Sequence, residues 1–235
     1  MKATTKAVLF DLDGTLFDRD ASFLELVQAQ YREFLTELAG VTKEAFVRRL
    51  VELDEHGYAD RLAVYREIAT ELGLPHSLAA RLTTHFHDTY ASFSKCFPEV
   101  PATLASLRRN GQKLGIITNG STNMQERKVH ELGIADLMDE LLISEKEGLR
   151  KPDPRIFRLA LGRLGVRAAE AWYVGDHPTV DIQGAFDAGL TPVWRCTPYW
   201  QQPEVPCGAI HSIDELLDML FGTIARHSAG ELSSG

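Results

Sequence analysis

Two aspartates stand two residues apart in the segment Phe10-Asp11-Leu12-Asp13-Gly14-Thr15-Leu16, directly after a short apolar run. In extended backbone, side chains two residues apart leave the same side of the chain, so one ligand could meet both carboxylates. One carboxylate could attack phosphorus as a nucleophile, while the other gives a proton to the leaving oxygen and later takes one from water. The spacing therefore indicates phosphoryl transfer through a covalent aspartate.

Further polar residues follow later apolar runs of the same kind. They supply a hydroxyl from Thr118, an amide from Asn119, which Gly120 follows, an ammonium from Lys151, and two carboxylates from Asp176 and Asp181. Single motifs also have structural explanations, because Asn-Gly is a common turn dipeptide and an Asp can cap a helix. Ligands of open parallel sheets, however, bind beyond the carboxyl ends of the strands. We therefore expect these residues to form one site with the two aspartates.

The charges of such a site predict a divalent cation. At about 4 Å and an effective dielectric constant of about 20, one pair of unit charges is worth about 4 kcal/mol, so a phosphate dianion facing one carboxylate is opposed by about 8 kcal/mol. Lys151 offsets a similar amount, but Asp176 and Asp181 add negative charge. Carboxylates without His or thiolate partners favour Mg²⁺ over zinc. We expect Mg²⁺ as the cofactor.

The elements that must position these residues follow from the hydrophobic pattern. Five apolar runs predict strands, and helical patterns separate them from the second run onward. The strands are Ala7–Phe10, Lys113–Thr118, Leu141–Ser144, Ala171–Gly175 and Thr191–Trp194; the helices are Val100–Arg109, Asn123–Leu132, Pro154–Leu164, Thr179–Ala188 and Ser212–Phe221. This alternation predicts βαβ units. The predicted fold class is α/β, a three-layer Rossmann-like core with a parallel sheet of at least five strands.

About 100 residues separate the first two predicted strands, far more than a crossover needs. Apolar residues recur at spacings of three and four from Phe23 to Leu38, and further helical patterns follow up to Phe93. We expect an inserted α-helical domain at residues 18–96, a core made of residues 1–17 and 97–225, and a flexible tail at 226–235.

The composition limits the partners. The chain has 25 Lys and Arg against 33 Asp and Glu and lacks a basic run, which argues against a nucleic-acid polymer. No apolar stretch approaches the length of a membrane span, and the apolar run after Lys6 is too short for a signal peptide. Three dispersed cysteines without a CxxC pair fit a reducing compartment. We expect a cytoplasmic monomer or homodimer that acts on a small phosphorylated metabolite.

The polar motifs resemble those of haloacid dehalogenase superfamily phosphohydrolases, in the family's order and over essentially the whole chain. The first motif is matched by residues 10–16, the second by Thr118, the third by Lys151 and the fourth by Gly175 and Asp176 with Asp181. The inserted helices resemble the family's cap domain, whose closure shields the reaction and shapes the substrate pocket.

This resemblance implies a role for each matched residue. Asp11 would be the nucleophile and Asp13 the general acid and base. Thr118 would hold a phosphoryl oxygen, and Lys151 would neutralise charge. The ligands of Mg²⁺ would be Asp11, the backbone carbonyl of Asp13, Asp176 and, directly or through water, Asp181.

The predicted function is that of a Mg²⁺-dependent phosphatase of small phosphate monoesters, either nucleoside monophosphates or sugar phosphates, with an aspartyl-phosphate intermediate. Asn119 beside Thr118 resembles relatives that cleave such substrates, so Asn119 and Gly120 are candidate substrate-binding residues. The alternatives are a phosphomutase, a dehalogenase and a phosphoaspartate signalling module. Dehalogenating relatives lack an acid two residues after the nucleophile, where this chain has Asp13.

Overall fold

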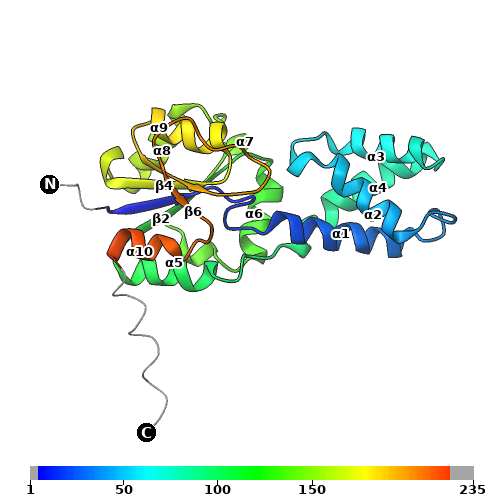
Figure 1. Cartoon of the computed structure of the whole chain (residues 1–235), viewed down its shortest axis with the longest axis horizontal. Helices are drawn as coiled ribbons and strands as arrows, with labels where there is room; N and C mark the ends of the chain where they lie inside the picture. Colours follow the sequence, from blue (N-terminus) through cyan, green and yellow to red (C-terminus); the bar gives the residue numbers. More distant parts are fainter. Residues whose placement is uncertain (1–4, 223–235) are drawn as a thin grey trace, which may run out of the picture. The chain divides into compact units, whose positions relative to one another are not determined.

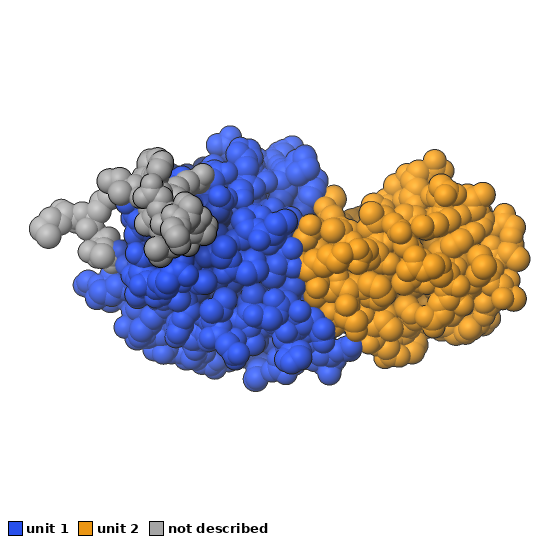
Figure 2. Space-filling view, turned by 90° about the horizontal axis from the view of Figure 1, so that it is seen from below, with its two compact units in different colours: residues 1–17, 96–235 blue, residues 18–95 orange. Residues whose placement is uncertain are grey.

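A computed structural model describes residues 5–222 of the chain, and the predicted tail at 226–235 lies outside this range. The chain forms two compact units, which Figure 2 shows in different colours. The core unit comprises the chain up to Phe17 and again from Cys96 onward, and the helical unit comprises Asp18–Lys95.

The core unit is built on one six-stranded sheet in which all neighbouring strands are parallel. Its order is β3-β2-β1-β4-β5-β6. The strands are β1 (Ala7–Phe10), β2 (Lys113–Thr118), β3 (Glu140–Ile143), β4 (Ala171–Gly175), β5 (Thr191–Arg195) and β6 (Gly208–Ile210). The prediction of an α/β fold with at least five parallel strands is confirmed. The sequence did not predict β6, because three residues that begin with glycine carry no recognisable strand pattern.

Helices cover both faces of this sheet, with α8 and α9 on one face and α5 and α10 on the other (Figure 1). The helices of the core unit are α5 (Val100–Arg109), α6 (Thr122–Glu131), α7 (Ser144–Glu147), α8 (Pro154–Leu164), α9 (Gly184–Asp187) and α10 (Glu215–Phe221), with short turns η3 (Ala135–Leu137), η4 (Ala168–Glu170) and η5 (Pro178–Gln183). All four residues of β1 are 0% exposed. Continuous apolar strands of this kind are typical of parallel sheets that are covered on both faces.

Helix α8 shows how local signals set an element that the sequence predicted. Asp153 caps its first turn by accepting a hydrogen bond from the amide of Arg155 at 2.9 Å, and Pro154 is the first helical residue. The helix ends at Leu164, and the next residue, Gly165, has a φ of 65°, a conformation that glycine adopts without steric cost. Between these ends, its apolar face packs into the core beside Leu9 and Tyr173.

The strand order reverses between β1 and β4. After β1, the chain builds β2 and β3 on one side, and it then returns to build β4, β5 and β6 on the other side. Phe10 is in register with Val174, and the amide of Asp11 donates to the carbonyl of Val174 at 2.8 Å. The two strands therefore end together at the switch point, which is the usual ligand position in a sheet of this kind.

The helical unit consists of four helices and two short turns, α1 (Arg19–Glu33), α2 (Lys43–Leu53), η1 (Glu55–Gly57), α3 (Arg61–Glu71), α4 (His76–Thr89) and η2 (Tyr90–Phe93). Side chains of Asp18, Thr42 and Asp60 cap the first three helices. The ends of the unit are joined where the amide of Asp18 donates to the carbonyl of Lys95 at 2.8 Å. Among residues 5–222, we find no helix with the length and apolar character that crossing a membrane requires.

The buried centre of the sheet gives a stability prediction. Leu9 is 0% exposed and packs in the core cluster under α8, so Leu9→Ala should lower the free energy of unfolding by about 3 kcal/mol. Leu35, which is 55% exposed, serves as the matched control, and Leu35→Ala should change the free energy of unfolding by less than about 0.5 kcal/mol. Urea unfolding of both variants makes the comparison. Equal losses would mean that the sheet does not depend on this contact.

Candidate active site

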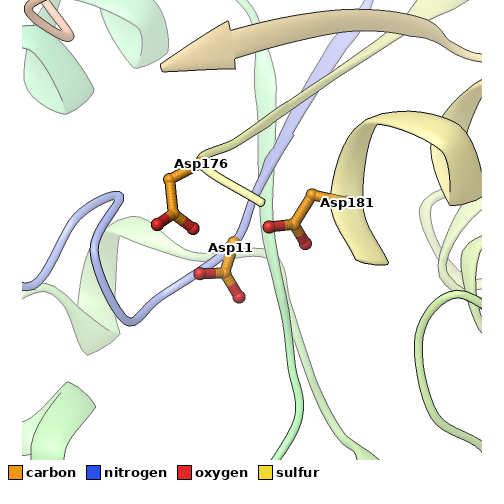
Figure 3. A group of neighbouring side chains, drawn as sticks. All are labelled: Asp11, Asp176 and Asp181. Carbon is orange, nitrogen blue, oxygen red and sulfur yellow. The ribbon is translucent and has the colours of Figure 1, made fainter. Parts of the chain in front are cut away.

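Three carboxylates turn toward one another beyond the ends of β1 and β4 (Figure 3). Asp11 directly follows β1, Asp176 directly follows β4, and Asp181 belongs to the turn η5. One oxygen of each lies within 4.8 Å of the others. Asp11, Asp176 and Asp181 are only 6%, 7% and 2% exposed, so bulk solvent screens their mutual repulsion weakly.

Two glycines make this approach possible. A Cβ atom on Gly175 would lie 2.5 Å from the Cβ of Asp181, and one on Gly14 would lie 2.8 Å from Oδ2 of Asp176. Gly14 also has a φ of 81°, which side chains disfavour. The glycines of the first and fourth motifs therefore leave the space that the carboxylates occupy.

The turn that carries Asp181 is wound more widely than the regular helix predicted from residue 179. The amides of Asp181 and Ile182 both donate to the carbonyl of His177, at 3.1 and 3.2 Å. His177 Nδ1 accepts from the amides of Thr179 and Val180, each at 3.1 Å. Burial lowers the pKa of His177, which agrees with a neutral ring that accepts these bonds. Wide turns of this kind are frequent at functional sites, and here the turn places a carboxylate in the cluster.

Lys151 supplies the positive charge of the cluster. Its Nζ contacts Oδ1 of Asp11 at 2.5 Å, Oδ1 of Asp181 at 2.7 Å and the hydroxyl of Tyr173 at 2.9 Å. The residue is 3% exposed. Burial disfavours its charge, but the carboxylates of Asp11 and Asp181 outweigh that effect and hold the pKa of Lys151 above its ordinary value. It is therefore an ammonium at neutral pH.

The four charged groups leave a deficit that a divalent cation would fill. Three carboxylates and one ammonium carry a net charge of −2 when all are ionised. Burial raises the pKa of Asp11 well above its usual range, although Lys151 opposes the shift. Burial, together with the charge of Asp181, raises the pKa of Asp176 to about 7. An all-oxygen donor set with two excess negative charges fits a hard dication such as Mg²⁺.

Two tryptophans fix Asp176. The Nε1 of Trp194 donates to its backbone carbonyl at 2.7 Å, and the Nε1 of Trp200 donates to Oδ2 at 3.2 Å. The ring of Trp200 also lies 4.4 Å from that of His177, centroid to centroid. Both indoles anchor the end of β4, and sequence reasoning did not connect either of them with this aspartate.

The end of β2 brings Thr118 to the site. The residue is 1% exposed, and its Oγ1 accepts a hydrogen bond from Nε2 of Gln125 at 2.6 Å. A hydroxyl that accepts one bond keeps its own hydrogen for another acceptor, such as a phosphoryl oxygen. The same nitrogen of Gln125 contacts Asp13, so Thr118 lies near the first motif, and its contact with a phosphoryl oxygen stays a prediction.

The next two residues contact the chain itself. The carboxamide of Asn119 donates to the carbonyl of Lys151 at 3.0 Å and accepts from its amide at 2.9 Å. The amide of Gly120 donates to Oγ of Ser144 at 3.0 Å. These bonds fix the segment that carries Lys151, and direct contact of Asn119 or Gly120 with a substrate stays a prediction.

The carboxylate of Asp13 is not one of the three that converge. Its Oδ2 accepts from Nε2 of Gln125 at 2.7 Å, and its Oδ1 lies 2.5 Å from Nζ of Lys128. Sequence reasoning missed both partners, as well as Tyr173. Their signals were present, because Gln125 and Lys128 are polar on the buried side of an amphipathic helix, and Tyr173 is polar inside a buried strand.

Fold and site together define a Rossmann-like α/β core with a carboxylate cluster, suited to a divalent cation, at the switch point of its sheet. A family model described as haloacid dehalogenase-like hydrolase matches residues 5–189. The chain belongs to this family. The resemblance of its motifs to those of superfamily phosphohydrolases is thereby confirmed.

Individual relatives agree with this assignment. The chain is 34% identical to a glyceraldehyde 3-phosphate phosphatase of Methanopyrus kandleri, over 92% of this chain and 97% of that protein. A magnesium-bound hydrolase of the family from Bacillus subtilis has the same fold, with a TM-score of 0.74 at 21% identity over 93% of this chain and 99% of that one. A 2-haloacid dehalogenase from Pseudomonas syringae is 31% identical, with a TM-score of 0.60 over 92% and 98% of the two chains.

The close packing at Gly175 gives a first prediction for the site. Gly175→Ala places a methyl group 2.5 Å from the Cβ of Asp181 and should lower the free energy of unfolding by about 1–3 kcal/mol. Gly162 lies inside α8 with no atom within 4 Å of an added Cβ, so Gly162→Ala should be neutral or stabilise by up to about 1 kcal/mol. Chemical denaturation of the two variants tests the difference, and a neutral Gly175→Ala would contradict the packing argument.

The raised pKa of Asp176 gives a second prediction. Below about pH 7 this carboxyl holds a proton that a cation must displace, so the affinity for Mg²⁺ should fall about tenfold per pH unit in that range and level off above it. The increase in Tm caused by Mg²⁺ should therefore be larger at about pH 8 than at about pH 5.5. Asp176→Asn should remove most of the increase and its pH dependence. An equal increase at both pH values would contradict a proton-linked cation site.

Proposed function

We propose that this protein is a Mg²⁺-dependent phosphatase that hydrolyses small phosphate monoesters through an aspartyl-phosphate on Asp11. The observation that carries the proposal is the buried cluster of Asp11, Asp176 and Asp181 around the ammonium of Lys151. The predicted enzyme class, a phosphoric monoester hydrolase, is confirmed by the family match and by the similarity to the phosphatase of Methanopyrus kandleri.

The cluster supports a specific division of charge. Asp11, Asp176 and Asp181, together with the backbone carbonyl of Asp13, would hold Mg²⁺, which supplies positive charge against the phosphoryl oxygens. Lys151 adds a second positive charge that is already in contact with Asp11. An acidic site needs both charges, because each unit of repulsion from an incoming phosphate is worth about 4 kcal/mol at 4 Å.

In the first half of the reaction, a carboxylate oxygen of Asp11 attacks phosphorus and the bond from phosphorus to the ester oxygen breaks. Asp13 gives a proton to that oxygen as it leaves, so an alcohol departs instead of an alkoxide. The hydroxyl of Thr118 donates to a phosphoryl oxygen, which holds the group for in-line attack.

In the second half, Asp13 takes a proton from a water molecule that attacks the phosphorus of the aspartyl-phosphate. The bond between Asp11 and phosphorus breaks, and orthophosphate leaves with Asp11 regenerated. The helical unit serves as the predicted cap domain, whose role is to exclude other water while the acyl-phosphate exists. The alpha-helical character of residues Asp18–Lys95 supports that assignment.

The substrate class that we favour is the sugar phosphates and related small phosphorylated metabolites. The relative from Methanopyrus kandleri, which matches over 92% of this chain, is named for a three-carbon phosphorylated aldehyde. Cytoplasmic location and a monomeric or homodimeric state stay predictions.

One similar solved structure is a 2-haloacid dehalogenase, so dehalogenation is the alternative to compare with phosphate ester hydrolysis. A halide leaves without a proton, so dehalogenation has no use for an acid beside the nucleophile. Here Asp13 stands two residues after Asp11 and is held by Gln125 and Lys128. An acid in a fixed position favours cleavage of an ester with an oxygen leaving group.

Phosphate release from a panel of phosphorylated metabolites tests the proposal. The wild-type protein should release orthophosphate from several sugar phosphates only when Mg²⁺ is present, and Asp11→Asn should abolish the release because the amide cannot form the acyl-phosphate. Circular dichroism should show that the variant remains folded. Activity that survives in Asp11→Asn would remove the covalent mechanism. A strict requirement for a sugar bisphosphate, without net phosphate release, would instead favour a phosphomutase.

A further inference from the structure

Helix α6 presents two polar side chains to Asp13 from one of its turns. Gln125 and Lys128 are three residues apart, which places them on the same face of the helix. Nε2 of Gln125 donates to Oδ2 of Asp13 at 2.7 Å, while Nζ of Lys128 lies 2.5 Å from Oδ1. Each oxygen of this carboxylate thus has its own donor from the same helix.

Gln125 has a second partner in the site. The same Nε2 atom donates to Oγ1 of Thr118 at 2.6 Å, so one amide nitrogen joins Thr118 to Asp13. The residue is 2% exposed. A Cβ on Gly120 would lie 2.9 Å from Cγ of Gln125, which means that glycine at this position leaves room for the side chain to reach both partners.

Lys128 is buried for a charged residue. It is 5% exposed, and its ammonium lies 4.9 Å from the centroid of the Phe17 ring in addition to its contact with Asp13. A buried ammonium is costly unless it is paired, and its contact with Asp13 supplies that pairing. Packing alone does not explain why α6 buries both the amide of Gln125 and the ammonium of Lys128. Apolar side chains would fill the same interface at a lower desolvation cost.

We propose that Gln125 and Lys128 are positioning residues for the reaction, in which Lys128 orients the carboxyl of Asp13 and Gln125 orients Asp13 and Thr118 together. The inference rests on the proposed phosphatase function and adds to it two residues outside the family motifs matched above. Gln125 contacts both the carboxyl of Asp13, which protonates the leaving oxygen, and the hydroxyl of Thr118, which holds the phosphoryl group. It therefore fixes the position of one group relative to the other. Small displacements of such groups reduce rates strongly.

This role predicts how the reaction rate of each variant depends on the leaving group. Misplacing Asp13 slows the departure of a poor leaving group, which needs a proton, and has little effect on an activated aryl group, which leaves as a stable anion. Misplacing Thr118 weakens the hold on the phosphoryl group whatever the leaving group. Lys128 variants should show the first effect, and Gln125 variants should show both.

The test compares kcat on glycerol phosphate and on para-nitrophenyl phosphate at saturating Mg²⁺. Lys128→Met should lower kcat on the alkyl ester about 10- to 100-fold and on the aryl ester less than about threefold. Gln125→Met should lower kcat on both esters, with a loss on the alkyl ester that is at least about tenfold larger than the loss on the aryl ester. Gln125→Met should also raise the inhibition constant of orthophosphate by at least about threefold. Lys128→Arg, which keeps a cationic donor, should restore much of the ratio between the two esters.

Glu126→Gln is the matched control, because Glu126 lies between the two residues on α6, is exposed and pairs with Lys146 at 2.8 Å. It should leave both activities unchanged. If either Met variant fails to fold by circular dichroism, the other variant together with Lys128→Arg carries the comparison. Equal losses on both esters, or an unchanged ratio, would overturn the inference. Wild-type protein that hydrolyses neither ester would instead refute the proposed function.

Discussion

The constraint on which the site depends is the mutual repulsion of buried carboxylates. Asp11, Asp176 and Asp181 meet within 4.8 Å, and Lys151 provides one ammonium for the three. At an effective dielectric constant of about 20, each like-charged pair at this range is worth several kcal/mol. The site therefore has a high affinity for positive charge, and this affinity allows an acidic protein to accept a phosphate ester.

The fold has to hold these groups together against that repulsion. The sheet does so because its strand order reverses between β1 and β4, so that Asp11 and Asp176 leave adjacent strands whose register is fixed by a buried core. Two neighbouring residues complete the arrangement. Gly175 leaves room for the side chain of Asp181, and the indole of Trp200 donates a hydrogen bond to the carboxylate of Asp176. Each of these devices limits how far a carboxylate can move to relieve the charge.

The two aspartates of the first motif have different surroundings although they are two residues apart. Asp11 is buried against Lys151 in the cation cluster, whereas the Asp13 side chain is 26% exposed and is held by Lys128. Two carboxylates with separate environments can take separate roles, one as nucleophile and one as proton carrier. Because each aspartate has its own lysine, the protein fixes the two groups independently while a short segment of backbone keeps them close.

The sequence by itself determined the parallel α/β core. The predicted bounds of β1, β2 and β4 agree in full with the structure, and those of β3 and β5 agree to within one residue at each end. The sequence also identified the motif residues that meet at the switch point. Apolar runs, period-3.6 patterns and strand-end motifs are local features of the sequence, so they can be recognised without knowledge of the groups that they contact. Only the tertiary structure decided which groups hold these residues. Gln125 and Lys128 contact Asp13 across 112 and 115 residues of chain. The helical pattern of α6 indicates that both lie on its buried side, but which group they meet there depends on the packing of α6 beside the end of β1.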